Sequence, residues 1–168
     1  MWTKEDEAFM QHALDVAERG RGRVAPNPLV GCVLVKEGEI IAEGGHDHLG
    51  GLHAEQMAIH DAEAKGKSPN GATAYVTLEP CAKEGRGPAC ADLLLQSGVF
   101  RVVYAVDDPD LRVNGQGRDK LIAGGVSVQN GLCEEEAAAG LSGFLALRRF
   151  SRPYLTSKIA TSADEAKH

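Results

Sequence analysis

Three residues of this chain have the chemistry of zinc ligands: His53, Cys81 and Cys90. One imidazole and two thiolates suit zinc, and three protein ligands leave the fourth tetrahedral position open, as in catalytic zinc sites. A water molecule in that position has its pKa lowered from about 15.7 to about 7. Glu55 lies two residues after His53, where a carboxylate can carry protons between such a water and a substrate nitrogen. These residues therefore predict hydrolytic deamination, with Glu55 as the catalytic acid and base and one Zn²⁺ per chain.

The spacing of the two cysteines is longer than in the common zinc deaminase pattern, His-x-Glu followed by Pro-Cys-x-x-Cys. The loop between them, residues 82–89, contains Gly85, Gly87 and Pro88. Glycine and proline suit a tight excursion that returns to its starting point. The longer spacing is therefore compatible with both sulfurs binding one ion.

The elements that must position these residues follow from hydrophobic periodicity and from turn residues. We expect strands at 29–35, 40–43, 72–78, 100–106 and 126–129. Helices are predicted from Thr3 to Gly20, from 53 to about 65 and at 90–97. A short helix is expected to follow Gly117 and end at Ala123, and one long helix is expected from 134 to about 150. Strands that alternate with helices after an initial hairpin predict an α/β protein, a three-layer α/β/α sandwich with a mixed five-stranded sheet.

In this layout, His53 and Cys90 fall in the first turns of two helices. The partial positive charge of a helix N-terminus favours a thiolate there. Positions two apart on a helix project about 200° apart, so Glu55 is expected beside the metal rather than as a fourth ligand.

Composition narrows the class of partner. The chain has 168 residues, enough for one domain, and a formal net charge of −6. Nucleic-acid binders need a basic surface, so we expect a small-molecule substrate and no nucleic acid. The charged N-terminus has no secretory pattern, and the longest apolar run, Leu29–Val35, is too short to span a membrane. Four cysteines, two of them in the metal motif, do not indicate a disulfide framework, so a cytoplasmic location is expected.

Longer runs of the sequence carry a resemblance. They are Ala25–Val33, Gly44–His46, His53–Glu55, Gly71–Cys81, Gly85–Arg86, Cys90, Asp108–Pro109, Val113–Gly117 and Arg152–Thr156. With these runs and its eight-residue gap between the cysteines, the chain resembles the deaminase domain of the bifunctional riboflavin-biosynthesis deaminase/reductase. The resemblance implies a cytidine-deaminase-like fold and deamination of a diamino-ribosylamino-pyrimidinone 5′-phosphate. It also implies a homo-oligomer, dimer or tetramer.

The resemblance implies substrate contacts at matching positions. Asn27 and His46 would line the pyrimidine pocket, and Arg86 would meet the substrate phosphate, a role that suits a bidentate guanidinium. Residues 1–150 would form the deaminase domain, and 151–168 would be a tail resembling the start of the reductase domain. No nicotinamide cofactor is expected in this chain.

The chain departs from the family pattern at Ala82, Lys83, Gly87, Ala89 and Asp110. Asp110 puts a negative charge near the expected phosphate, and Lys83 adds a positive charge that offsets it and makes Lys83 a further candidate for substrate binding. These departures keep two alternatives open. One is a deaminase of another small base or nucleoside, such as guanine, cytosine or an antibiotic precursor. The other is a non-catalytic, zinc-stabilised scaffold.

Overall fold

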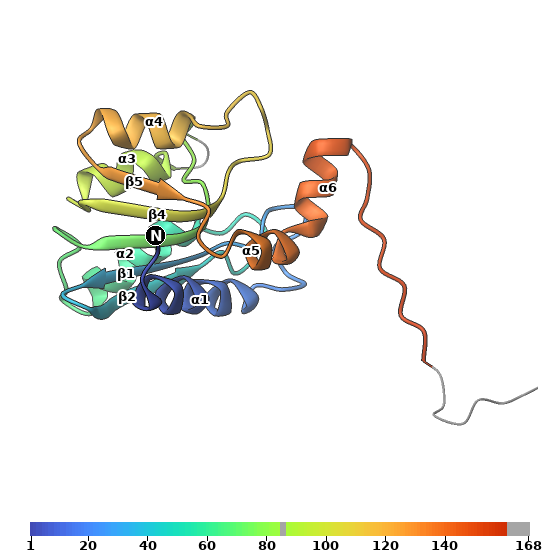
Figure 1. Cartoon of the computed structure of the whole chain (residues 1–168), viewed down its shortest axis with the longest axis horizontal. Helices are drawn as coiled ribbons and strands as arrows, with labels where there is room; N and C mark the ends of the chain where they lie inside the picture. The colour runs from blue at the N-terminus through green and yellow to red at the C-terminus, as the bar shows by residue number, and fades with distance from the viewer. Residues whose placement is uncertain (85–86, 161–168) are drawn as a thin grey trace, which may run out of the picture.

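A computed structural model describes residues 1–84 and 87–160 as a layered α/β fold (Figure 1). Its central sheet has the strand order β2-β1-β3-β4-β5. The strands are β1 (Gly31–Lys36), β2 (Glu39–Gly45), β3 (Thr73–Leu78), β4 (Arg101–Val106) and β5 (Ser127–Asn130). β1 is antiparallel to β2 and β3, whereas β3, β4 and β5 are parallel, so the predicted mixed five-stranded sheet is confirmed.

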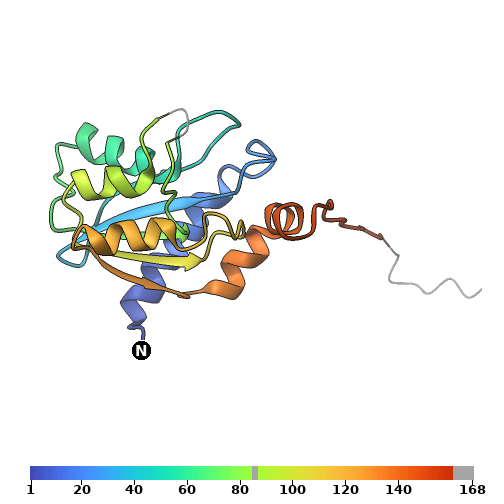
Figure 2. The same ribbon diagram turned by 90° about the horizontal axis from the view of Figure 1, so that it is seen from above.

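Helices cover both faces of this sheet. α1 (Lys4–Glu18) and α5 (Glu134–Gly140) lie on one face. α2 (Ala54–Ala64), α3 (Cys90–Gln96) and α4 (Gln116–Ala123) lie on the other, as the two views together show (Figures 1 and 2). The three-layer arrangement predicted from the alternation of elements is therefore confirmed.

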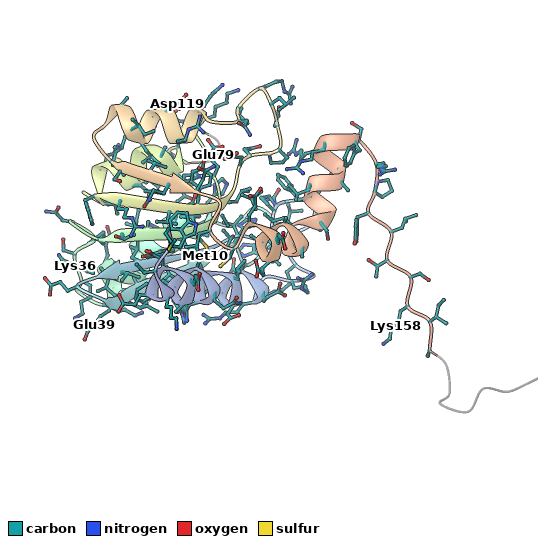
Figure 3. The ribbon with its side chains drawn as sticks, viewed as in Figure 1. Met10, Lys36, Glu39, Glu79, Asp119 and Lys158 are labelled. Carbon is teal, nitrogen blue, oxygen red and sulfur yellow. The ribbon has the colours of Figure 1, made fainter. Side chains whose placement is uncertain are left out.

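The core lies between these layers because the three central strands, β1, β3 and β4, are buried on both faces. All six residues of β3 are buried, as expected for a strand covered on both sides. Met10 of α1 is fully buried against the sheet (Figure 3). Gly31 and Gly44 permit close contact, since a Cβ there would meet the backbone of α1 at 2.0 Å and of α2 at 2.2 Å.

The predicted single helix from 134 to 150 is wrong. The chain forms α5 and then a separate helix, α6 (Ser142–Phe150), with the break at Leu141. Gly140 and Gly143 flank the break, and glycine disfavours a helix interior by about 1 kcal/mol. Leu141 is buried, so its packing fixes the point at which the chain changes direction (Figure 1).

Beyond α6, residues 151–160 have no regular secondary structure and are exposed. The predicted domain boundary at 150 therefore coincides with the end of a helix, and its interpretation as a domain boundary stays a prediction. Within the described ranges, no helix has the length and apolar character needed to cross a membrane.

Candidate functional site

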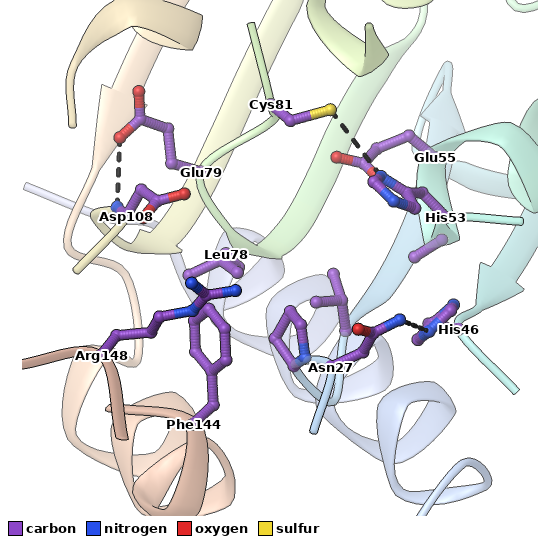
Figure 4. A pocket seen from close by; sticks show the side chains of 13 residues that line it. Asn27, His46, His53, Glu55, Leu78, Glu79, Cys81, Asp108, Phe144 and Arg148 are labelled. Atoms are coloured by element: carbon purple, nitrogen blue, oxygen red, sulfur yellow. Dashed lines mark hydrogen bonds between the residues drawn. The ribbon is translucent and has the colours of Figure 1, made fainter. Parts of the chain in front are cut away.

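One edge of the sheet gathers the predicted site residues. β3 and β4 are parallel, so the segments that follow them, with Cys81 and Asp108, meet at their carboxyl ends. β1 runs the opposite way, and its register pairs Gly31 with Gly45, so the segments carrying Asn27 and His46 arrive at the same edge. The topology therefore brings together residues from four separate parts of the sequence. They line a cavity of about 210 Å³ (Figure 4).

The three predicted ligands lie together. His53 immediately precedes α2, Cys81 follows β3, and Cys90 begins α3. The His53 Nδ1 atom is 3.3 Å from Cys90 Sγ and 3.7 Å from Cys81 Sγ. All three ligand atoms lie within 4.8 Å of one another. Zinc–ligand bonds of about 2.0–2.3 Å in tetrahedral geometry put nitrogen and sulfur about 3.6 Å apart, so the triangle fits a zinc ion.

The pKa values of the two thiols, Cys81 and Cys90, shift in opposite directions. A hydrogen bond from the Cys90 thiol lowers the pKa of Cys81 to about 4, and although burial opposes this, hydrogen bonds from His53 and from the Cys90 backbone N–H support it. That backbone N–H lies 3.3 Å from Cys81 Sγ. The same thiol contact and burial raise the pKa of Cys90. These contacts favour the thiolate form of Cys81, the form that binds zinc.

Glu55 lies in the first turn of α2 and is 4% exposed. Burial raises its pKa to about 7, and the negative charge of Cys81 adds to this rise. Its side chain lines the same cavity as His53 and Cys81 (Figure 4). A carboxyl group that titrates near neutral pH can both accept and donate a proton, the property that general acid–base catalysis requires.

A pair of hydrogen bonds fixes the orientation of Asn27. His46 is 3% exposed, and its Nδ1 lies 2.8 Å from the carbonyl oxygen of Leu52, which can only accept, so Nδ1 carries the proton. The other ring nitrogen, Nε2, must then accept, and it lies 3.0 Å from the side-chain amide nitrogen of Asn27. The Asn27 amide oxygen is left facing the cavity as an acceptor (Figure 4).

Glu79 connects the segment carrying Cys81 to the opposite wall of the cavity. Its buried carboxylate accepts backbone N–H groups of Asp108 at 3.1 Å, Gly115 at 3.0 Å, Gly117 at 3.1 Å and Arg118 at 3.3 Å. Only glycine fits at position 117, since a Cβ there would lie 1.8 Å from the Pro80 carbonyl oxygen. The loop after β4 is therefore fixed to the ligand-bearing segment.

The two predicted cationic contacts have different outcomes. Lys83 does not line the main cavity but an adjoining hollow of about 360 Å³, which shares Asn27, His53 and Cys81 with it. Arg86 lies outside the described residues, so its proposed phosphate contact stays a prediction.

Sequence reasoning assigned no role to four charged or aromatic residues that line the cavity: Glu79, Asp108, Phe144 and Arg148. Phe144 and Arg148 come from α6, far along the chain from the motif. For Glu79 a signal was present, because an acidic residue directly after a buried strand needs partners.

Comparison with known proteins agrees with this geometry. The family model described as the cytidine and deoxycytidylate deaminase zinc-binding region matches residues 3–106. The riboflavin biosynthesis protein RibD of Escherichia coli is 46% identical over 160 residues, which are 95% of this chain and 43% of that protein. RibD of Aquifex aeolicus is 45% identical over 159 residues, 95% of this chain and 44% of that protein. The chain thus spans less than half the length of these curated relatives.

Solved structures show the same similarity. A structure of Acinetobacter baumannii RibD matches with a TM-score of 0.85 and 44% identity, covering 90% of this chain and 42% of that chain. A dCMP deaminase from the cyanophage S-TIM5, solved in complex with dCMP and dUMP, matches with a TM-score of 0.62 and 26% identity. That match covers 77% of this chain and 98% of that one.

Proposed function

Since the chain belongs to the cytidine and deoxycytidylate deaminase family, we propose that it deaminates a diamino-ribosylamino-pyrimidinone 5′-phosphate by hydrolysis. The observation that carries the proposal is the ligand triangle of His53, Cys81 and Cys90 beside the buried Glu55. The choice of substrate is supported by the identity of 44–46% to RibD proteins. A zinc-stabilised scaffold has no use for a buried acid with a pKa of about 7 in the cavity.

One zinc ion per chain, held by these three side chains, would supply a Lewis acid that lowers the pKa of water to about 7. The pyrimidine enters the cavity with its amino-bearing carbon near Glu55. Glu55 takes a proton from the attacking water and delivers it to the departing amine, so that water and the amino compound become the oxo product and ammonia. Asn27, held by His46, accepts a hydrogen bond from an N–H group of the substrate.

Two further expectations belong to this proposal. The partner is a small pyrimidine nucleotide rather than a nucleic acid, and the chain associates with copies of itself. A cytoplasmic location is the setting that we propose for the reaction.

The test is a panel assay of ammonia release. The substrates are the diaminopyrimidinone ribotide, its dephosphorylated riboside, dCMP, cytosine and guanine. We expect the ribotide to have the highest kcat/KM. Higher turnover of cytosine or guanine would move the function to a free-base deaminase, and no release from any substrate by zinc-loaded protein would favour the scaffold.

A further inference from the structure

α6 brings a positive charge to the cavity from outside the zinc motif. Arg148 lines the cavity with Phe144 and Asp108. Its guanidinium lies beside the Phe144 ring, across the cavity from His53 and Glu55 (Figure 4). The guanidinium carbon is 5.5 Å from the ring centroid, within the range of a cation–π contact. Phe144 therefore restrains a charge at the side of the cavity remote from the candidate reacting position.

This guanidinium is not committed to a carboxylate. Neighbouring arginines in the fold are paired: Arg112 with Asp110 at 2.7 Å and Arg118 with Asp119 at 3.3 Å. Across residues 1–84 and 87–160, Arg148 forms neither an ion pair nor a hydrogen bond. The Arg148 guanidinium is therefore available to bind an anion.

Glu79 on this side of the site accepts four backbone N–H groups. Two further acidic groups lie near Arg148, and both are engaged. Asp110 is neutralised by Arg112, which contacts both of its carboxylate oxygens. Asp108 uses one oxygen to accept the Asp110 backbone N–H at 2.8 Å. Burial raises the pKa of Asp108, and the charge of Arg148 opposes this rise. The nearby aspartates therefore leave an uncommitted cation on the cavity wall.

We propose that Arg148 binds the 5′-phosphate of the nucleotide substrate, which makes the site select phosphorylated over unphosphorylated pyrimidines. This inference rests on the proposed function. When the reacting carbon of the ring lies at Glu55, the substituent on the far side of the ring projects across the cavity towards α6. A planar guanidinium presents parallel N–H donors that match phosphate oxygens.

The experiment compares Arg148→Met with Arg149→Met. Methionine keeps an apolar chain against Phe144 and removes the charge. Arg149 is the next residue of the same helix. It lines an adjoining surface hollow, which Asp108 and Arg148 also line, but it does not line the cavity. For each protein, kcat/KM is measured on the diaminopyrimidinone ribotide and on its riboside, after zinc content is matched.

We expect Arg148→Met to lower the ratio of the two kcat/KM values about 10-fold, the loss of one charge-assisted contact. Arg149→Met should change that ratio less than 2-fold, and Arg148→Lys should restore part of it. An unchanged ratio in Arg148→Met would overturn the inference. If the wild-type protein turns over neither compound, the proposed function fails. Calorimetric binding of the ribotide and riboside to the same variants then decides the role of Arg148 separately.

Discussion

Two buried carboxylates, Asp6 and Glu55, are 6% and 4% exposed, yet their surroundings are opposite in character. Asp6 lies in α1 on one face of the sheet and Glu55 in α2 on the other. Burial alone raises the pKa of both. For Asp6 this is outweighed by hydrogen bonds from Thr3, Tyr75 and Arg101, which lower its pKa to about 2. For Glu55 the negative Cys81 adds to burial, and its pKa rises to about 7.

The difference separates an acid that stabilises the fold from the acid that we propose is catalytic. Asp6 accepts the Tyr75 hydroxyl at 2.7 Å and an Arg101 N–H at 3.0 Å, and it closes a capping box with Thr3 at the start of α1. Its charge therefore stabilises the fold. Glu55 is buried beside the proposed sulfur ligands, where burial and the charge of Cys81 make its own negative charge unfavourable, and we attribute this arrangement to the proposed catalytic role. Burial of a carboxylate therefore indicates its role only when its hydrogen-bond partners and neighbouring charges are considered as well.

The sharpest test of this contrast is Glu55→Gln, which keeps the shape and removes the titratable group. Loss of a positioned general acid and base lowers kcat about 10²- to 10⁴-fold. Zinc content and melting temperature should be retained, because Glu55 contributes little to the fold. Glu63→Gln, at an exposed position of the same helix, is the control. A variant with more than a tenth of the wild-type kcat would remove Glu55 from its proposed role.

The reverse result is expected for Asp6→Ala. The substitution removes the Asp6 half of the capping box and takes the carboxylate away from the Arg101 guanidinium and the Tyr75 hydroxyl, so the free energy of unfolding should fall by about 3 kcal/mol. The specific activity of the folded fraction should be unchanged. Urea unfolding measures the first quantity, with Asp15→Ala at an exposed position of α1 as the control. A loss no larger than that of the control would mean that the Asp6 contacts contribute nothing to stability.

The pH dependence of stability provides a second measure of Asp6. Its pKa is lowered from near 4 to about 2, so its charge contributes about 2 kcal/mol above pH ~4. This contribution should decline as the pH falls from about 4 towards 2. The difference in unfolding free energy between the wild type and Asp6→Asn should therefore shrink over that range. A difference that stays constant from pH 7 to pH 2 would contradict the assignment.

A smaller effect on activity is expected for a substitution of Glu79, because its carboxylate holds the backbone of the loop after β4 in place. In Glu79→Gln, the carboxylate that accepts four backbone N–H groups becomes an amide with one acceptor oxygen. We expect zinc affinity to weaken about 10-fold and KM to rise, with kcat of the zinc-saturated enzyme little changed. Competition with a chromophoric chelator measures the affinity. A variant that only melts earlier, with wild-type zinc affinity and KM, would reduce Glu79 to a purely structural role.

Sequence reasoning identified the residues that chemistry constrains by type and spacing. His53, Glu55, Cys81 and Cys90 belong to that class, and so do the central strands β1, β3 and β4, which are rich in apolar residues. Arg148 was not found, because its importance depends on the break at Leu141, and a 3.6-residue periodicity continues across that point. The glycines on either side were the available signal. Lys83 was assigned to the substrate from its charge alone. It lines the adjoining hollow, and its contact with the substrate stays a prediction.

We propose above all that three side chains of this protein hold one metal ion beside a proton-carrying acid. The most direct test is to remove zinc with a chelator, add it back in known equivalents, and follow ammonia release from the diaminopyrimidinone ribotide. We expect no turnover without the metal and a linear rise that ends at one zinc per chain. Undiminished turnover after complete removal of the metal, or a zinc-saturated protein that releases no ammonia, would contradict it.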